Sequence, residues 1–128
     1  DTPQPDPEGH WKFCYETFIK DTVEDEIADS FLRLLSYSKH RGIDLSPSFF
    51  MGNCVEMMHS FMLREVCLPE QLYTVVFTIT QEFEYSISTA LTRLIVLARI
   101  NDIDLLWHIE QKMKYNEMRP YKHGGKKY

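Results

Sequence analysis

The stretch FLRLLSYSKHRGIDL, residues 31–45, returns in altered form sixty residues later as LTRLIVLARINDIDL, residues 91–105. Five positions are identical, and several others keep their chemical type. In each copy an apolar helical pattern ends in a turn and leads toward a second helix. The match predicts a repeated helix–turn–helix, and its offset fits two helical hairpins of roughly thirty residues each.

The first copy closes a long amphipathic helix. Thr22 begins the stretch Thr-Val-Glu-Asp, which resembles a capping box and places acids in the first turn, where the helix dipole favours them. The cations of residues 39–41 and then Gly42 form a strong stop signal. One apolar stripe joins the two ends, made of Val23, Ile27, Phe31, Leu34, Leu35 and Ser38.

Two further helices are predicted in the middle of the chain. Ser46-Pro47 is an N-cap followed by proline at the first helical position. The helix that follows, residues 47–63, is apolar nearly all round, which is typical of a central helix. Leu68-Pro69 starts another, with apolar residues at helical spacing to Phe83. Its β-branched run at 74–80 is a competing strand signal, but the spacing and the proline start favour a helix.

The remaining segments also read as helical. Residues 10–20 are rich in aromatic side chains and predict a short helix or an ordered strap. An apolar stripe over residues 87–98 ends near Asn101-Asp102, and a second one covers residues 103–113 after a very short turn. Asp102 is expected as a turn residue or an N-cap. We therefore expect an all-α fold of five to six antiparallel helices stacked as helical hairpins, either a short α-solenoid or a compact helical bundle.

The inter-helix phrase of residues 39–54 is similar to the pentatricopeptide signature, in which a Gly-Ile step precedes a new helix. Across residues 31–62, and more loosely 91–115, the chain resembles an α-solenoid of the tetratricopeptide or pentatricopeptide type. It departs from both families, because the tetratricopeptide Trp/Gly/Tyr/Ala/Pro series is absent and three regular repeats cannot be placed. The resemblance implies architecture alone, with no binding-code residues.

Composition sets the domain organisation. The chain of 128 residues is one domain's length, and its 44% apolar content is globular. Residues 1–9 form an expected disordered acidic, proline-rich linker, residues 10–119 the helical domain, and residues 120–128 a basic flexible tail. Residues 1–30 carry nine acids and two bases, whereas residues 85–128 carry four acids and eight bases. The linker-like start suggests a fragment of a larger protein.

Three cysteines, Cys14, Cys54 and Cys67, cannot all pair, which favours reduced thiols and an intracellular protein, cytoplasmic or nuclear. No apolar run is long enough to span a bilayer, so no membrane role is expected. The cysteines are far apart and no C-x-x-C or H-x-x-x-H occurs, so neither a metal nor another cofactor is expected. His10 and Cys14 are the one local Cys–His pair, without a recognisable third group, so we expect no enzyme.

Two features suit binding. Methionines 51, 57, 58 and 62 could line a groove for a partner helix, although a core helix also explains them. The basic C-terminal third could contact single-stranded RNA, although a solvated face also explains it. Candidate protein-interface residues are Trp11, Tyr15, Met57, Met58, Trp107 and Tyr115, and candidate RNA contacts are Lys112, Lys114, Arg119, Lys122, Lys126 and Lys127.

The sequence therefore predicts a non-enzymatic protein–protein interaction or scaffold module. Its expected partner is a helix or peptide of another protein, or a second copy of the chain. The alternative is an RNA-binding helical-repeat domain that uses the basic C-terminal third, which the overall net charge of −5 disfavours.

Overall fold

The computed structural model describes residues 7–45, 67–81 and 86–119, and all regular structure in these ranges is helical. The helices are α1 (Pro7–Phe18), α2 (Val23–His40), α4 (Leu68–Thr80), α5 (Ser86–Ile100) and α6 (Leu105–Met118). The predicted all-α fold is confirmed, including the helix that competed with a strand. The predicted helix 47–63 and tail 120–128 lie outside the described residues. Helix α1 begins at Pro7, so residues 7–9 of the expected linker are helical.

The ends of α2 follow the predicted signals. The Thr22 side chain accepts a hydrogen bond from the amide of Asp25, which is the first half of a capping box. At the other end Gly42 has a φ of +66°, a left-handed conformation that glycine adopts without the clash a Cβ would cause. The amide of Ile43 then donates to the carbonyl of Ser38 at 2.9 Å, which closes a Schellman motif.

The sixty-residue echo has the same local geometry in both copies. Asp102 takes the place of Gly42 with a φ of +55°, and the amide of Ile103 donates to the carbonyl of Ala98 at 2.8 Å. Asp102 is therefore the turn residue. The N-cap of α6 is Asp104, whose side chain accepts from the amide of Trp107. The turn is reproduced after each helix, whereas the partner helix of the first copy lies outside the described residues.

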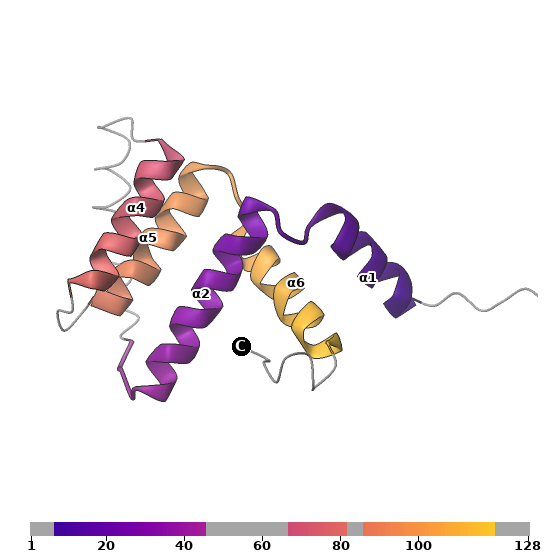
Figure 1. Cartoon of the computed structure of the whole chain (residues 1–128), viewed down its shortest axis with the longest axis horizontal. Coiled ribbons are helices and arrows are strands. Elements are labelled where there is room, and N and C mark those ends of the chain that lie inside the picture. Colours follow the sequence, from indigo (N-terminus) through magenta and orange to yellow (C-terminus); the bar gives the residue numbers. More distant parts are fainter. Residues whose placement is uncertain (1–6, 46–66, 82–85, 120–128) are drawn as a thin grey trace, which may run out of the picture.

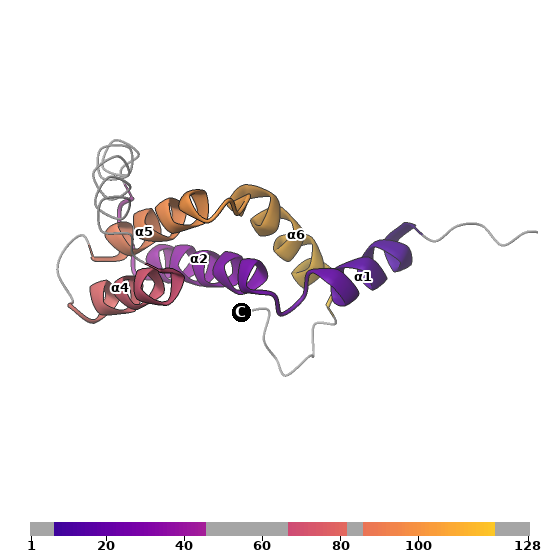
Figure 2. The same ribbon diagram turned by 90° about the horizontal axis from the view of Figure 1, so that it is seen from above.

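Figures 1 and 2 show an elongated arrangement with α4 at one end and α1 at the other. Helices α4 and α5 run antiparallel. This is seen in a hydrogen bond of 2.7 Å that Asn101, just past the end of α5, donates to Gln71, near the start of α4. The core lies between α2, α4 and α5. Its buried members are Ile27, Val75, Ala90, Leu94 and Leu97.

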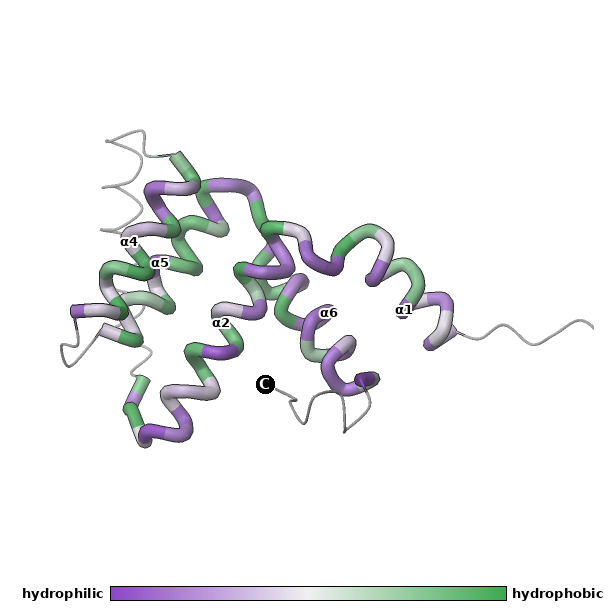
Figure 3. The backbone as a smooth tube through the Cα atoms, in the orientation of Figure 1, coloured by the Kyte–Doolittle hydropathy of each residue, from purple (hydrophilic) through white to green (hydrophobic). Residues whose placement is uncertain are grey.

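Among the described helices, α5 is the most deeply buried. Polar residues such as Ser88 and Thr92 are buried there together with the apolar ones, and the Thr92 hydroxyl donates to the carbonyl of Ser88. Figure 3 shows hydrophobic residues following one another along α4 and α5. The predicted stripe of α5 is buried, but the burial extends around most of the helix. Helix α5 therefore holds a central position among the described helices.

Candidate interaction surfaces

Two of the predicted interface aromatics are buried, which corrects the expectation that they are exposed. Tyr15 is fully buried and Tyr115 is nearly so, and their rings stack at 4.5 Å between centroids. Trp11 continues the stack at 5.2 Å from Tyr15 and donates its indole N–H to Gln111 at 3.0 Å. These aromatic side chains pack α1 against α6 and therefore have a structural role. The helical spacing predicted Trp11, Tyr15 and Phe18 on one face. Trp11 and Tyr15 do share an internal face, whereas Phe18 is exposed.

The stack adjoins a buried ion pair through Tyr15. The Tyr15 hydroxyl donates to the carboxylate of Asp25, which is fully buried in the first turn of α2. The Lys112 ammonium, also buried, lies 3.3 Å from the second oxygen of Asp25. The amide of Asp21 donates to this same oxygen at 3.1 Å. A buried carboxylate needs such partners, since removal from water is costly for an unpaired charge. The network links α1, α2 and α6.

This ion pair removes Lys112 from the set of candidate RNA contacts, which is a second correction. A lysine that is buried beside a carboxylate cannot also neutralise a phosphate. Lys114 is exposed, but its ammonium lies over the Trp11 ring at 4.5 Å from the centroid. Arg119 caps the end of α6 and is half-buried. The other candidates, Lys122, Lys126 and Lys127, lie outside the described residues, as do Met57 and Met58.

Burial and, next, the hydrogen bond to Asp25 raise the pKa of the Tyr15 phenol well above its ordinary value. The unfolded chain loses this proton near pH 10, whereas the folded protein retains it. The contribution of Tyr15 to the free energy of unfolding is therefore complete below about pH 10. Above that pH it falls by up to about 1.4 kcal/mol per pH unit. We expect Tyr15→Phe to remove this component of alkaline destabilisation, measured by urea unfolding between about pH 8 and pH 11.

Tyr73→Phe is the matched control, because this tyrosine is solvent-exposed in the folded protein. It should leave the dependence of stability on pH unchanged. Equal alkaline slopes for the wild-type protein and Tyr15→Phe would show that the buried phenol does not contribute.

The outer face of α4 exposes neighbouring apolar side chains. Tyr73, Val76 and Phe77 expose 67%, 58% and 51% of their surface, and the two rings stack at 6.3 Å. Their spacing places them on one side of the helix. No charged residue occurs from Gln71 to Gln81. We call Tyr73, Val76 and Phe77 the α4 outer face.

Sequence reasoning missed this surface. The apolar residues that it placed at helical spacing along this helix included both Val75 and Val76, whereas Val75 is buried and Val76 is exposed. The signal was nevertheless present, because the helix carries a second apolar row beside the inner row of Leu72, Val75 and Ile79. A helix of this length at the end of a stack needs one apolar row for its own packing. The second apolar row is not needed for that packing and therefore indicates a binding surface.

Helix α6 exposes apolar side chains as well, but in a different setting. Leu106 and Met113 are exposed two turns apart, with Glu110 between them and Glu117 one turn further on. Trp107 is exposed, as predicted, and its ring meets His108 edge-on at 4.8 Å. Charged residues are depleted at the centres of protein interfaces. The α4 outer face therefore fits an interface core better than this part of α6 does.

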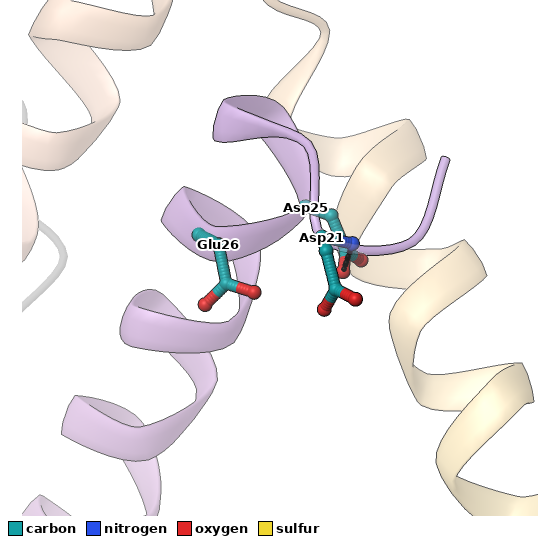
Figure 4. A group of neighbouring side chains, drawn as sticks. All are labelled: Asp21, Asp25 and Glu26. Atoms are coloured by element: carbon teal, nitrogen blue, oxygen red, sulfur yellow. Dashed lines mark hydrogen bonds between the residues drawn. The ribbon is translucent and has the colours of Figure 1, made fainter. Parts of the chain in front are cut away.

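Three acids gather at the start of α2. The carboxylates of Asp21, Asp25 and Glu26 lie within 4.8 Å of one another, as drawn in Figure 4. The Asp25 carboxylate already accepts from Tyr15, from Lys112 and from the amide of Asp21. The Lys112 ammonium is thus the cation beside Asp25, which is the buried residue of this acidic group. Helix-dipole and capping interactions account for acids in the first turn of α2.

The local Cys–His pair is brought into contact in α1. The Cys14 sulfur lies 3.7 Å from Nε2 of His10, with His10 exposed and Cys14 half-buried. Cys14 and Cys67 are free thiols. Among the described residues, no third Cys, His, Asp or Glu side chain joins the pair in a group of three potential ligands. The pair therefore offers two neighbouring side chains of the kinds that bind metal ions, on the partly exposed side of α1.

In the part of the chain that the structure describes, helices pack around a buried ion pair, and α4 presents an apolar outer face. The chain matches no protein-family model, no curated protein and no solved structure. Across the described residues, none of the helices has the length and apolar character needed to cross a bilayer.

Proposed function

We propose that this protein is a non-enzymatic, intracellular interaction or scaffold module whose α4 outer face binds the apolar face of a helix from another protein. The observation that carries the proposal is the exposure of Tyr73, Val76 and Phe77 side by side on a charge-free stretch of helix. An amphipathic partner helix presents apolar side chains at the same three- and four-residue spacing. The two surfaces would pack with their ridges interleaved.

The residue types on this face favour binding over accidental exposure. Aromatic side chains each bury roughly 150–250 Å² and dominate interface energetics. Tyr73 and Phe77 are stacked on each other, so their side chains are already partly ordered in the free protein. This lowers the entropy cost of binding a partner. Burial of an apolar surface is worth about 25 cal/mol per Å² before the cost of association is subtracted. The face can therefore supply the central contacts of an interface, while its rim would come from neighbouring polar residues.

The buried polar groups support a non-enzymatic role. Asp25, Lys112 and Tyr15 satisfy one another inside the helix packing. A group that serves acid–base chemistry needs access to a substrate, which this buried arrangement denies. The network instead gives α1, α2 and α6 a fixed mutual position, which suits a rigid scaffold.

The test is capture of tagged protein from cell lysate, with and without ribonuclease, using three forms of the chain. The wild-type protein is compared with the double variant Tyr73→Ser/Phe77→Ser and with the control Leu106→Ser/Met113→Ser, which removes exposed apolar side chains from α6. We expect a protein partner that survives ribonuclease, binds the α6 variant, and is lost from the α4 variant. Partners retained by the α4 variant would contradict the proposal.

The ribonuclease arm addresses the alternative, RNA binding by the basic C-terminal third. Loss of every partner on digestion would favour RNA. The follow-up variant is then Lys114→Glu/Arg119→Glu, because Lys112 must be spared as a structural residue. Removal of phosphate contacts weakens binding and lowers its dependence on salt concentration.

A further inference from the structure

Helix α1 has two distinct faces. Trp11 and Tyr15 point into the aromatic stack with α6, as described above. The adjacent arc carries His10, which is exposed, and Cys14, which is half-buried, with Phe13 and Phe18 on either side, both strongly exposed. The three charged residues of α1, at positions 8, 12 and 16, lie outside this arc at helical spacing. This partly exposed arc is thus an uncharged patch with a histidine and a cysteine, two residue types that bind metal ions, in its middle.

The separation of the two ligand atoms matches shared coordination of one metal ion. Zinc binds a cysteine sulfur at about 2.3 Å and a histidine nitrogen at about 2.0–2.1 Å in tetrahedral geometry. At the tetrahedral angle these bond lengths place the two ligand atoms about 3.6 Å apart. The Cys14 sulfur and His10 Nε2 are 3.7 Å apart. One turn of helix has therefore placed both atoms at the spacing needed to bind the same ion, with little movement of either side chain.

From this geometry we propose that His10 and Cys14 are half of a zinc site, completed by the same two residues of a second copy of the chain. Structural zinc takes four ligands, and two cysteines with two histidines are a common set. Cys14 would bind as the thiolate, and its proton would pass to solvent. The zinc would thus join two α1 helices through their outer arcs.

A second copy fits this arc for a reason beyond ligand number. A symmetric interface brings each residue of the arc close to its own counterpart, so charges within it would repel. The arc has none, and the exposed Phe13 and Phe18 of each copy supply apolar area around the ion. The same contact without metal would be small, because a single helix face lies well below the area of a standard interface. Dimerisation through α1 is therefore expected to depend on zinc.

The experiment is sedimentation velocity of the full chain in a non-thiol reductant, with zinc chloride added or with a chelator. The reductant prevents a disulfide between the two Cys14 thiols. We expect a monomer in chelator and a dimer with zinc, at about one ion per two chains. Cobalt(II) in place of zinc should give the absorption bands of a tetrahedral thiolate site. An unchanged mass with zinc, or one ion bound per monomer, would overturn the proposal.

Variants locate the site. Cys14→Ser and His10→Ala should each abolish the zinc-dependent dimer and the cobalt bands while leaving the helical fold intact, because His10 is exposed and serine nearly matches the size of the half-buried Cys14. Cys67→Ser is the matched control, since Cys67 is an exposed free thiol with a leucine rather than a histidine four positions before it in the sequence. It should leave both signals unchanged. Persistence of the zinc dimer in Cys14→Ser would overturn the proposal.

This proposal does not rest on the partner of the α4 outer face. The variant Tyr73→Ser/Phe77→Ser should form the zinc dimer as the wild-type protein does. Loss of the zinc dimer in that variant would overturn the assignment to α1.

Discussion

Replacement of Lys112 by methionine is expected to lower the free energy of unfolding by about 3 kcal/mol, one of the two largest effects anticipated for this chain. Methionine keeps the aliphatic stem but removes the positive charge beside Asp25, which is fully buried. The carboxylate would retain hydrogen bonds from Tyr15 and from the amide of Asp21, but no counter-charge. An uncompensated buried charge typically costs about 3–5 kcal/mol, and the remaining hydrogen bonds favour the lower end.

Urea unfolding of Lys112→Met and of Lys114→Met provides the comparison. Lys114 is two residues away on the same helix, but it is exposed and contacts the face of Trp11. Loss of that contact should cost at most about 1 kcal/mol. If the two variants were equally stable, Asp25 would not depend on Lys112 and the ion pair would not hold the helices together.

Leu94→Ala is expected to lower the free energy of unfolding by about 2–5 kcal/mol. Leu94 is almost completely buried in α5 and belongs to the core cluster with Ile27 of α2 and Val75 of α4. Its truncation removes apolar burial and leaves a cavity between three helices, which the backbone cannot fully close. The measurement is again urea unfolding, with the circular dichroism of the folded state as a check that the helices remain.

Leu106→Ala is the control for this prediction, because it makes the same chemical change at an exposed site on α6. Its effect should be within about 0.5 kcal/mol. A small effect of Leu94→Ala, similar to that of the control, would contradict the placement of α5 at the centre of the described core.

Local sequence signals predicted the helix ends well. Thr22 caps α2 and Gly42 ends it, and the sixty-residue echo correctly anticipated a second turn of the same kind at Asp102. These features depend on residues within one or two helical turns of each other. Capping and turn geometry are local, so their chemistry can be recognised without knowledge of the tertiary structure.

Long-range pairing was beyond such signals. Asp25 and Lys112 are 87 positions apart, and each had a sufficient local explanation, as a first-turn acid and as one of several basic residues near the C-terminus. Likewise, nothing local showed that the face bearing Tyr15 would pack on Tyr115. To predict these pairings one must know how α1, α2 and α6 are arranged in space. The spacing of residues in a single sequence does not show that arrangement. The wrongly assigned candidates therefore cluster where three helices meet.

The α4 outer face was only partly predictable from the sequence. Its spacing was readable, since Tyr73, Val76 and Phe77 follow a helical pattern, but its exposure depended on which apolar row packs on α5. The structure resolves that choice through Val75, which is buried with Leu94 and Leu97. The face left exposed at the end of the helix stack is the basis of the proposed interaction (Figure 1).

Site-specific photo-crosslinking tests the proposed interaction surface most directly. A photoreactive phenylalanine analogue would replace Phe77 in one sample and Tyr37 in another, because both are exposed aromatic side chains but Tyr37 lies on α2. After irradiation in cells, we expect a discrete protein adduct from position 77 and none from position 37. Adducts of equal yield from both positions, or none from position 77, would contradict the assignment of the α4 outer face as the binding surface.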